Sequence, residues 1–65
     1  MLGYKIKELR EELHMTQEQL SKKANVSRTI ISGLESGAIK ITTTGTLLKI
    51  AKALNVKVND IFFDV

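Results

Sequence analysis

The stretch TQEQLSKKANVSRTIISGLESG, residues 16–37, decides the fold of this 65-residue chain. Thr16 is followed three residues later by a glutamine, a pattern that predicts a capped helix start. Asn25 tolerates a left-handed backbone and can therefore end that helix in a tight turn. Ser27 then predicts the start of another helix, which Gly37 ends. The stretch thus predicts two short helices separated by a tight turn.

The apolar residues on both sides of this stretch also recur at helical spacing. The first stripe consists of Leu2, Ile6, Leu9 and Leu13, and the second of Leu47, Ile50, Ala51 and Leu54. Residues 39–42 alternate and are β-branched, but a single short strand would lack a partner, so we expect an extended loop there. A last short turn is expected at about residues 58–62.

We therefore expect an all-α fold, a compact bundle of four to five short helices. The length suits one domain, residues 1–65, and the two helices within about residues 16–36 have the dimensions of a helix-turn-helix. A domain of this size buries only about 60% of its unfolded surface, so its core must be compact.

The composition excludes several classes of function. With no cysteine and a single histidine, His14, the chain offers neither a disulfide framework nor a thiolate metal site. It also lacks a convergent carboxylate pair, so we expect no enzyme, no metal, no cofactor and no small-molecule ligand. No apolar run approaches a membrane span or a signal peptide, which predicts a soluble cytoplasmic protein. The net charge of +3 is compatible with an anionic partner.

Five short strings stand in register along nearly the whole chain. They are IKELR at residues 6–10, MTQEQL at 15–20, VSRTIIS at 26–32, LESG at 34–37 and LLKIAKAL at 47–54. Together they resemble the Cro/repressor-type (XRE-like) helix-turn-helix proteins. The resemblance implies a lambda-repressor-like fold and a transcriptional regulator, a repressor, that binds double-stranded DNA in a sequence-specific way. The chain departs from the family after Gly37, where AIKITTT stands in place of a basic loop with a proline and is about one residue longer.

The helix that starts after Ser27 has an apolar stripe on one side and small polar side chains on the other, at 100° per residue. The resemblance makes it the helix that enters the major groove, where such side chains reach base edges. We therefore predict base contacts by Arg28, Thr29 and Ser32, and close approach of DNA to the backbone of Gly33. Taken without the resemblance, the same residues fit an ordinary exposed helix face, and Gly33 fits a tolerated substitution equally well.

Contacts to the DNA backbone are expected at two helix starts and in the loop between them. Gln17 matches the position at which the family has a phosphate-contacting glutamine, and free N–H groups next to Thr16 favour an anion there. Thr43 and Thr44 offer the same chemistry at the start of the last long helix, with Lys40 as the nearby cation. Helix capping is the alternative role of the threonines.

Arg10 and Glu35 are predicted to support the scaffold rather than to contact DNA. Arg10 lies on the apolar stripe of the first helix, and Glu35 lies at the margin of the buried stripe of its own helix. Buried charges need partners, and these two have opposite sign. The resemblance implies a structural ion pair between them.

One such domain covers half a site, so we expect a homodimer on a pseudo-palindromic operator, with half-sites about 34 Å apart or a multiple of that distance. The apolar residues expected to take part in self-association are Ile39, Ile41, Phe62 and Phe63. The same residues favour the competing hypothesis of a protein-interaction module, such as an antitoxin whose main ligand is its toxin. RNA binding is disfavoured, because one tyrosine and two phenylalanines make a poor platform for stacking bases.

Overall fold

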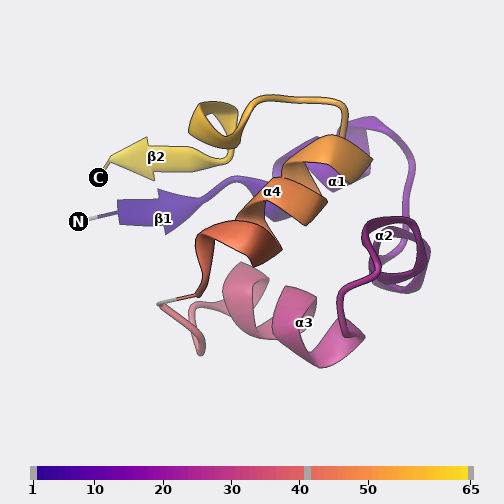
Figure 1. The fold of residues 1–65 in the computed structure, drawn as a ribbon, viewed down its shortest axis with the longest axis horizontal. Helices are drawn as coiled ribbons and strands as arrows, with labels where there is room; N and C mark the ends of the chain where they lie inside the picture. Colours follow the sequence, from indigo (N-terminus) through magenta and orange to yellow (C-terminus); the bar gives the residue numbers. More distant parts are fainter. Residues whose placement is uncertain (1, 41, 65) are drawn as a thin grey trace.

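A computed structural model describes residues 2–40 and 42–64, and the side chains of residues 4–40 and 42–61. Helix α4 crosses the middle of the molecule, α3 lies along one edge, and the two strands lie at the opposite edge (Figure 1). Among the described residues, no helix has the length and apolar character needed to cross a membrane. The elements in chain order are β1 (Leu2–Tyr4), α1 (Ile6–Glu12), α2 (Gln17–Ala24), α3 (Arg28–Ser36), α4 (Thr44–Ala53), the 3-10 turn η1 (Val58–Asp60) and β2 (Phe62–Asp64).

The ends of α2 and α3 confirm the helix boundaries predicted from the sequence. Thr16 Oγ1 accepts a hydrogen bond from the backbone N–H of Gln19 at 3.0 Å, and the N–H of Thr16 donates to Gln19 Oε1 at 2.8 Å. Asn25 ends α2 in the left-handed region, with φ of 56°. Ser27 Oγ accepts from the N–H of Ile30 at 3.2 Å, and α3 ends at Gly37 with φ of 85°.

Three of the helices end in the same backbone turn. After α1, α2 and α4 the chain passes through a left-handed residue that is not glycine: His14, Asn25 and Asn55. In each case the next N–H donates to the carbonyl five residues back, as from Met15 to Arg10 at 3.0 Å. This pattern satisfies carbonyl groups that a helix end otherwise leaves without partners. A left-handed backbone costs a side-chain-bearing residue free energy, least for asparagine.

Helix α4 is the centre of the hydrophobic core. Its predicted apolar stripe, Leu47, Ile50, Ala51 and Leu54, is confirmed, because all four side chains are buried. Every other α-helix contributes to the core, and so does the residue after η1. The buried cluster consists of Ile6, Leu20, Ala24, Ile31, Leu34, Ile50, Ala51, Ala53, Leu54 and Ile61. Since full burial of a leucine or isoleucine stabilises by about 1.5–3 kcal/mol, this cluster holds the helices together.

The apolar stripe predicted for the first helix is only partly right. Ile6 is fully buried and Leu9 is half-buried against the core. Leu2, however, lies in β1 and so precedes the helix. Leu13 follows the last residue of α1 and is 47% exposed. Spacing alone does not show where a helix begins and ends, and α1 has only 7 residues.

A two-stranded antiparallel sheet joins the two ends of the chain, and the sequence analysis did not predict it. The paired residues are Leu2 with Asp64, Gly3 with Phe63 and Tyr4 with Phe62. The turn expected at residues 58–62 is present as η1 but ends earlier, because β2 begins at Phe62. The four α-helices confirm the predicted all-α bundle, with this small sheet added to it. As expected, the described residues of the 38–43 loop form neither helix nor strand.

Candidate nucleic-acid interface

Helix α3 presents a polar face to solvent. Its apolar residues Ile31 and Leu34 are buried, whereas Arg28, Thr29 and Ser32 are exposed. Arg28 and Thr29 occupy the first turn of the helix. When a helix docks in a major groove, residues of this first turn reach the base edges.

The exposed face of α3 forms a wall of an open hollow of about 460 Å³, which we call the α3 concavity. Its lining residues are Gln17, Arg28, Thr29, Ser32, Gly33, Ser36 and Ala38. The structure therefore brings Gln17 of α2 beside all four of the α3 residues predicted to lie at the bases. Among these lining residues Arg28 carries the only charge. Apart from Gln17, whose amide donates to the Glu35 carboxylate, the remaining lining residues are small, so they leave room for DNA to approach α3.

Gly33 packs against the loop that follows α3. Its backbone is buried, and a Cβ atom built on it would lie 2.5 Å from Cδ1 and 2.6 Å from Cγ1 of Ile39. The side of Gly33 on which a Cβ would stand is therefore filled by Ile39, but Gly33 also lines the α3 concavity, so the predicted approach of DNA to its backbone stays a prediction. Ile39 is half-buried and packs against the core, so it is less exposed than expected, and its part in self-association stays a prediction.

The structure brings Arg10 of α1 together with Glu35 of α3. Arg10 donates from Nε to Glu35 Oε2 and from Nη2 to Glu35 Oε1, both at 2.9 Å. Gln17 Nε2 also donates to Glu35 Oε1, at 3.2 Å. Only 11% of the Arg10 side chain and 5% of the Glu35 side chain are exposed. Arg10 Nη1 further donates to the carbonyl of Met15 at 2.7 Å, so one guanidinium links α1, the following turn and α3.

The hydrogen bond to Glu35 raises the pKa of Arg10 above its usual value, against the opposing effect of burial. The charges of Glu35 and Glu11 raise this pKa further. Because the pKa of Arg10 is higher in the folded protein than in the unfolded chain, its charge stabilises the fold fully at any pH below the pKa of the unfolded chain. This stabilisation is lost only when the pH rises through the pKa of the folded protein. Since an arginine titrates far above neutral pH, Arg10 stays charged under ordinary conditions.

The threonines at the helix starts act as caps, which is the alternative that the sequence left open. Besides Thr16, Thr43 Oγ1 accepts from the N–H of Thr46 at 3.2 Å and so caps α4. Thr44 is the exposed first residue of α4. Capping engages one N–H in each first turn, and other N–H groups of that turn remain available to a phosphate oxygen.

Two hydrogen bonds hold the backbone of the loop after α3, one at Ile39 and one at Lys40. The N–H of Ile39 donates to the carbonyl of Gly33 at 2.9 Å, and the Tyr4 hydroxyl donates to the carbonyl of Lys40 at 2.8 Å. The Lys40 side chain is exposed. Of the residues predicted to contact the DNA backbone, Gln17 lines the α3 concavity, whereas Thr16, Lys40, Thr43 and Thr44 do not.

Lys7 is a cation beside α3 that the sequence analysis missed. It is exposed on α1 and shares a hollow with Ser32 and Ser36 of α3. The signal was available in the spacing, because Lys7 stands three residues before Arg10 and such residues share a helix face.

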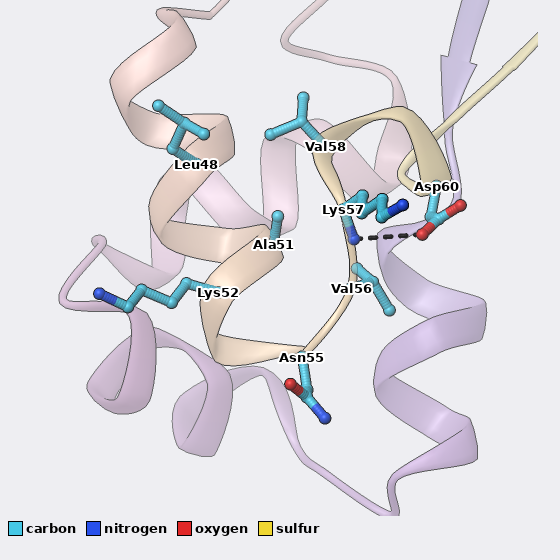
Figure 2. A pocket seen from close by; sticks show the side chains of 8 residues that line it. All are labelled: Leu48, Ala51, Lys52, Asn55, Val56, Lys57, Val58 and Asp60. Carbon is cyan, nitrogen blue, oxygen red and sulfur yellow. Dashed lines mark hydrogen bonds between the residues drawn. The ribbon is translucent and has the colours of Figure 1, made fainter.

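A second open hollow, of about 930 Å³, lies between α4 and η1; we call it the α4–η1 groove. Its lining residues are Leu48, Ala51, Lys52, Asn55, Val56, Lys57, Val58 and Asp60. Leu48 is 53% exposed and stands on the opposite side of the groove from Val58 (Figure 2). No residue of α3 lines the groove, so it is separate from the α3 concavity. Of the other residues expected in self-association, Ile41 and the side chains of Phe62 and Phe63 lie outside the described residues.

The fold and the exposed face of α3 define a class of protein: a compact helical domain with a helix-turn-helix formed by α2 and α3. A family profile described as Helix-turn-helix matches residues 6–61. The chain therefore belongs to the helix-turn-helix family, as its resemblance to the Cro/repressor-type (XRE-like) proteins predicted.

Two curated relatives and one solved structure support this assignment. An uncharacterized HTH-type transcriptional regulator of Archaeoglobus fulgidus is 41% identical over 58 residues, covering 89% of this chain and 80% of the relative. The ImmF control region 10 kDa protein of Bacillus phage phi105 is 38% identical over 58 residues, again covering 89% of this chain but 63% of the phage protein. A mutant of the restriction–modification controller protein C.Esp1396I has a TM-score of 0.73 and 44% identity, covering 80% of this chain and 66% of that one. DNA-binding transcription regulation is the functional class that these findings give.

Proposed function

We propose that this chain is a repressor-type regulator that reads an operator half-site in double-stranded DNA by placing α3 in the major groove. The α3 concavity is the observation that carries the proposal, because a polar face of small side chains with one arginine lies beside the start of α2. The buried side of α3 packs on the core, so this face is held rigidly and meets DNA without rearrangement.

Base readout is assigned to three side chains of α3. Arg28 can donate two hydrogen bonds to O6 and N7 of a guanine, the commonest specific contact in the major groove. Thr29 can bond to a base edge or place its methyl group against that of a thymine, and Ser32 can bond to a base directly or through water. All three are exposed and on the same side of the helix as the α3 concavity.

Contacts to the phosphate backbone are assigned to the flanking elements. The first turns of α2 and α4, at Gln17 and Thr44, supply N–H groups at the positive end of each helix. The Gln17 amide nitrogen carries two N–H groups, so its bond to Glu35 leaves the other free to donate. Exposed positive charge comes from Lys7, which shares a hollow with Ser32 and Ser36 of α3, and from Lys40 in the loop after α3.

We place the contact between two copies of the chain on an operator at the α4–η1 groove. A two-fold interface must be complementary to itself, and this groove carries both signs of charge, Lys52 and Lys57 with Asp60. Leu48 gives it an exposed apolar residue. Because α3 contributes nothing to the groove, such a contact leaves α3 free to bind DNA.

The competing function is a protein-interaction module whose main ligand is another protein. The α4–η1 groove is the observation that favours it, because a groove with an apolar wall can also receive a different partner. The two functions make different demands on α3. Only a DNA reader needs the polar face of α3, whereas a protein ligand in the groove would not touch it.

Selection of bound sequences from a random duplex DNA pool tests the proposed function. We expect enrichment of a short motif, repeated as a pseudo-palindrome with half-site centres about 34 Å apart or a multiple of that distance. A pool that stays random after repeated rounds, although the folded protein is present, would contradict sequence-specific readout and favour the protein-interaction module.

A further inference from the structure

We propose that Gly33 is a positioning residue for DNA binding: it admits Ile39 against α3 and thereby fixes the loop that carries Lys40. The inference rests on the proposed function and names a residue pair that sets its geometry. It assigns Gly33 and Ile39 to one packing contact within the chain.

Contact between Gly33 and Ile39 requires the absence of a side chain at residue 33. A Cβ there would lie 2.5 Å from Cδ1 and 2.6 Å from Cγ1 of Ile39, closer than non-bonded carbon atoms approach. It would also lie 3.3 Å from Cβ of Ile39, an atom that no change of rotamer moves. Isoleucine is stiff at χ1, so relief requires movement of the loop backbone as well as of the side chain.

The same pair is joined by its backbone. The N–H of Ile39 donates to the carbonyl of Gly33 at 2.9 Å. This bond is made just beyond the end of α3, where the chain has already turned back at Gly37. The side-chain packing and the hydrogen bond therefore hold the loop against α3 at the same place.

Lys40 is the residue that this arrangement positions. It follows Ile39 directly, and the Tyr4 hydroxyl donates to its carbonyl at 2.8 Å, so its backbone is held from two sides. Ala38, on the other side of Ile39, lines the α3 concavity. A shift of Ile39 thus moves a lysine assigned to phosphate and a wall of the surface assigned to bases.

A helix interior is an unfavourable place for glycine, which costs about 1 kcal/mol relative to alanine. An alanine at residue 33 would stabilise α3 in isolation while displacing Ile39. The two effects oppose each other, so stability alone does not reveal the role of Gly33. The role is revealed by measuring DNA binding and the order of the loop.

The test uses four proteins: the parent, Gly33→Ala, Ile39→Ala and the double variant. The double variant adds a methyl group at residue 33 and removes the clashing Cδ1 and Cγ1 atoms of Ile39, together with its Cγ2. Affinity for a duplex of about 30 base pairs with random sequence is measured at two salt concentrations. Amide hydrogen exchange at Ile39 is measured in the same proteins without DNA. The control Gly45→Ala adds a methyl group to α4, where the nearest atom is Thr43 Oγ1 at 3.9 Å.

We expect Gly33→Ala to remain folded and to lose protection of the Ile39 amide. Its affinity should fall about tenfold, the size expected for one hydrogen bond to a charged group, and its salt dependence should weaken by about one unit. Ile39→Ala should lose part of the DNA affinity and part of the protection of the amide of residue 39. The double variant should bind DNA more tightly than the sum of the two single losses in affinity predicts. Protection of the backbone amide of residue 39 should be partly restored in it. Gly45→Ala should leave the exchange of the Ile39 amide unchanged.

Two results would overturn the inference while leaving the proposed function intact: parent-like DNA binding by Gly33→Ala, or losses in the single variants that simply add in the double variant. A parent protein that binds no DNA at either salt concentration would contradict the proposed function itself, and the positioning role with it. The exchange measurement separates these cases, because it reports the loop without DNA.

Discussion

At the scale of single residues, Glu35 is the point at which scaffold and proposed DNA contact meet. Its carboxylate accepts two hydrogen bonds from Arg10 and one from Gln17. Gln17 lines the α3 concavity, so the ion pair that joins α1 to α3 also orients a side chain assigned to phosphate. Removing one partner of such a pair leaves an unpaired charge in poorly hydrated surroundings, which costs more than removing both.

Arg10→Met is therefore expected to lower the free energy of unfolding by about 3 kcal/mol, at the lower end for a buried pair because Arg10 keeps some exposure. The Arg10→Met/Glu35→Leu double variant should recover much of this loss. Recovery should stay incomplete, since the bond from Arg10 to the Met15 carbonyl is also gone. Urea denaturation of the parent, Arg10→Met and the double variant measures these changes in the free energy of unfolding. An Arg10→Met variant as stable as the parent would show that the pair contributes nothing.

At the scale of the elements, the sequence predicted those features that depend on neighbouring residues. The capping box at Thr16, the left-handed turn at Asn25, and the cap at Ser27 are local patterns, and the structure has all three. The pairing of β1 with β2 joins opposite ends of the chain, so no local pattern announces it. Packing of Ile39 against Gly33 was missed for a different reason: a glycine does not show in the sequence what fills the space beside it.

The candidate site divides in the same way. The exposed face of α3 follows from helical spacing, so the positions of Arg28, Thr29 and Ser32 were predictable. Their proximity to Gln17 depends on how α2 packs on α3 and could come only from the family resemblance. Lys7 was missed because its neighbours on α3 are distant in sequence.

The end of α1 gives a prediction at this scale. His14 adopts a left-handed backbone with φ of 57°, which costs a residue with a side chain about 1–2 kcal/mol. Glycine would avoid that cost but would lose about 0.4–1 kcal/mol through its freer unfolded chain. We therefore expect His14→Gly to raise the free energy of unfolding by up to about 1 kcal/mol.

Asn25→Gly and Asn55→Gly are the matched controls, because they alter the same turn at residues that already tolerate it. Both should gain less than His14→Gly in the same denaturation experiment. A loss of stability in His14→Gly would mean that the imidazole makes a contact worth more than the strain of the backbone.

At the scale of the whole molecule, the α3 concavity and the α4–η1 groove are separate surfaces, so DNA reading and self-association can be tested independently. The described residues include two large exposed apolar side chains, Leu48 in the groove and Leu13 after α1, with similar exposure of 53% and 47%. They form a matched pair for substitution by serine.

Leu48→Ser should weaken binding to an operator with two half-sites about tenfold, as expected for the loss of one buried leucine, and leave binding to a single half-site unchanged. Leu13→Ser should change neither. Sedimentation of the protein with each DNA shows how many copies bind. Equal effects of the two substitutions, or one copy per full operator, would remove the groove from the proposed dimer contact.

The central claim is that α3 reads DNA sequence through Arg28, and one measurement tests it most directly: binding of Arg28→Ala and Lys40→Ala to a library of single-base variants of the selected operator, at two salt concentrations. Arg28→Ala should lose discrimination at one base pair, a G·C, by about 1–3 kcal/mol and keep the preferences elsewhere. Lys40→Ala should weaken binding to every sequence alike and flatten the salt dependence by about one unit. If Arg28→Ala instead shifts every operator variant by the same factor, Arg28 acts only as a charge and the assignment of the α3 face to base readout is wrong.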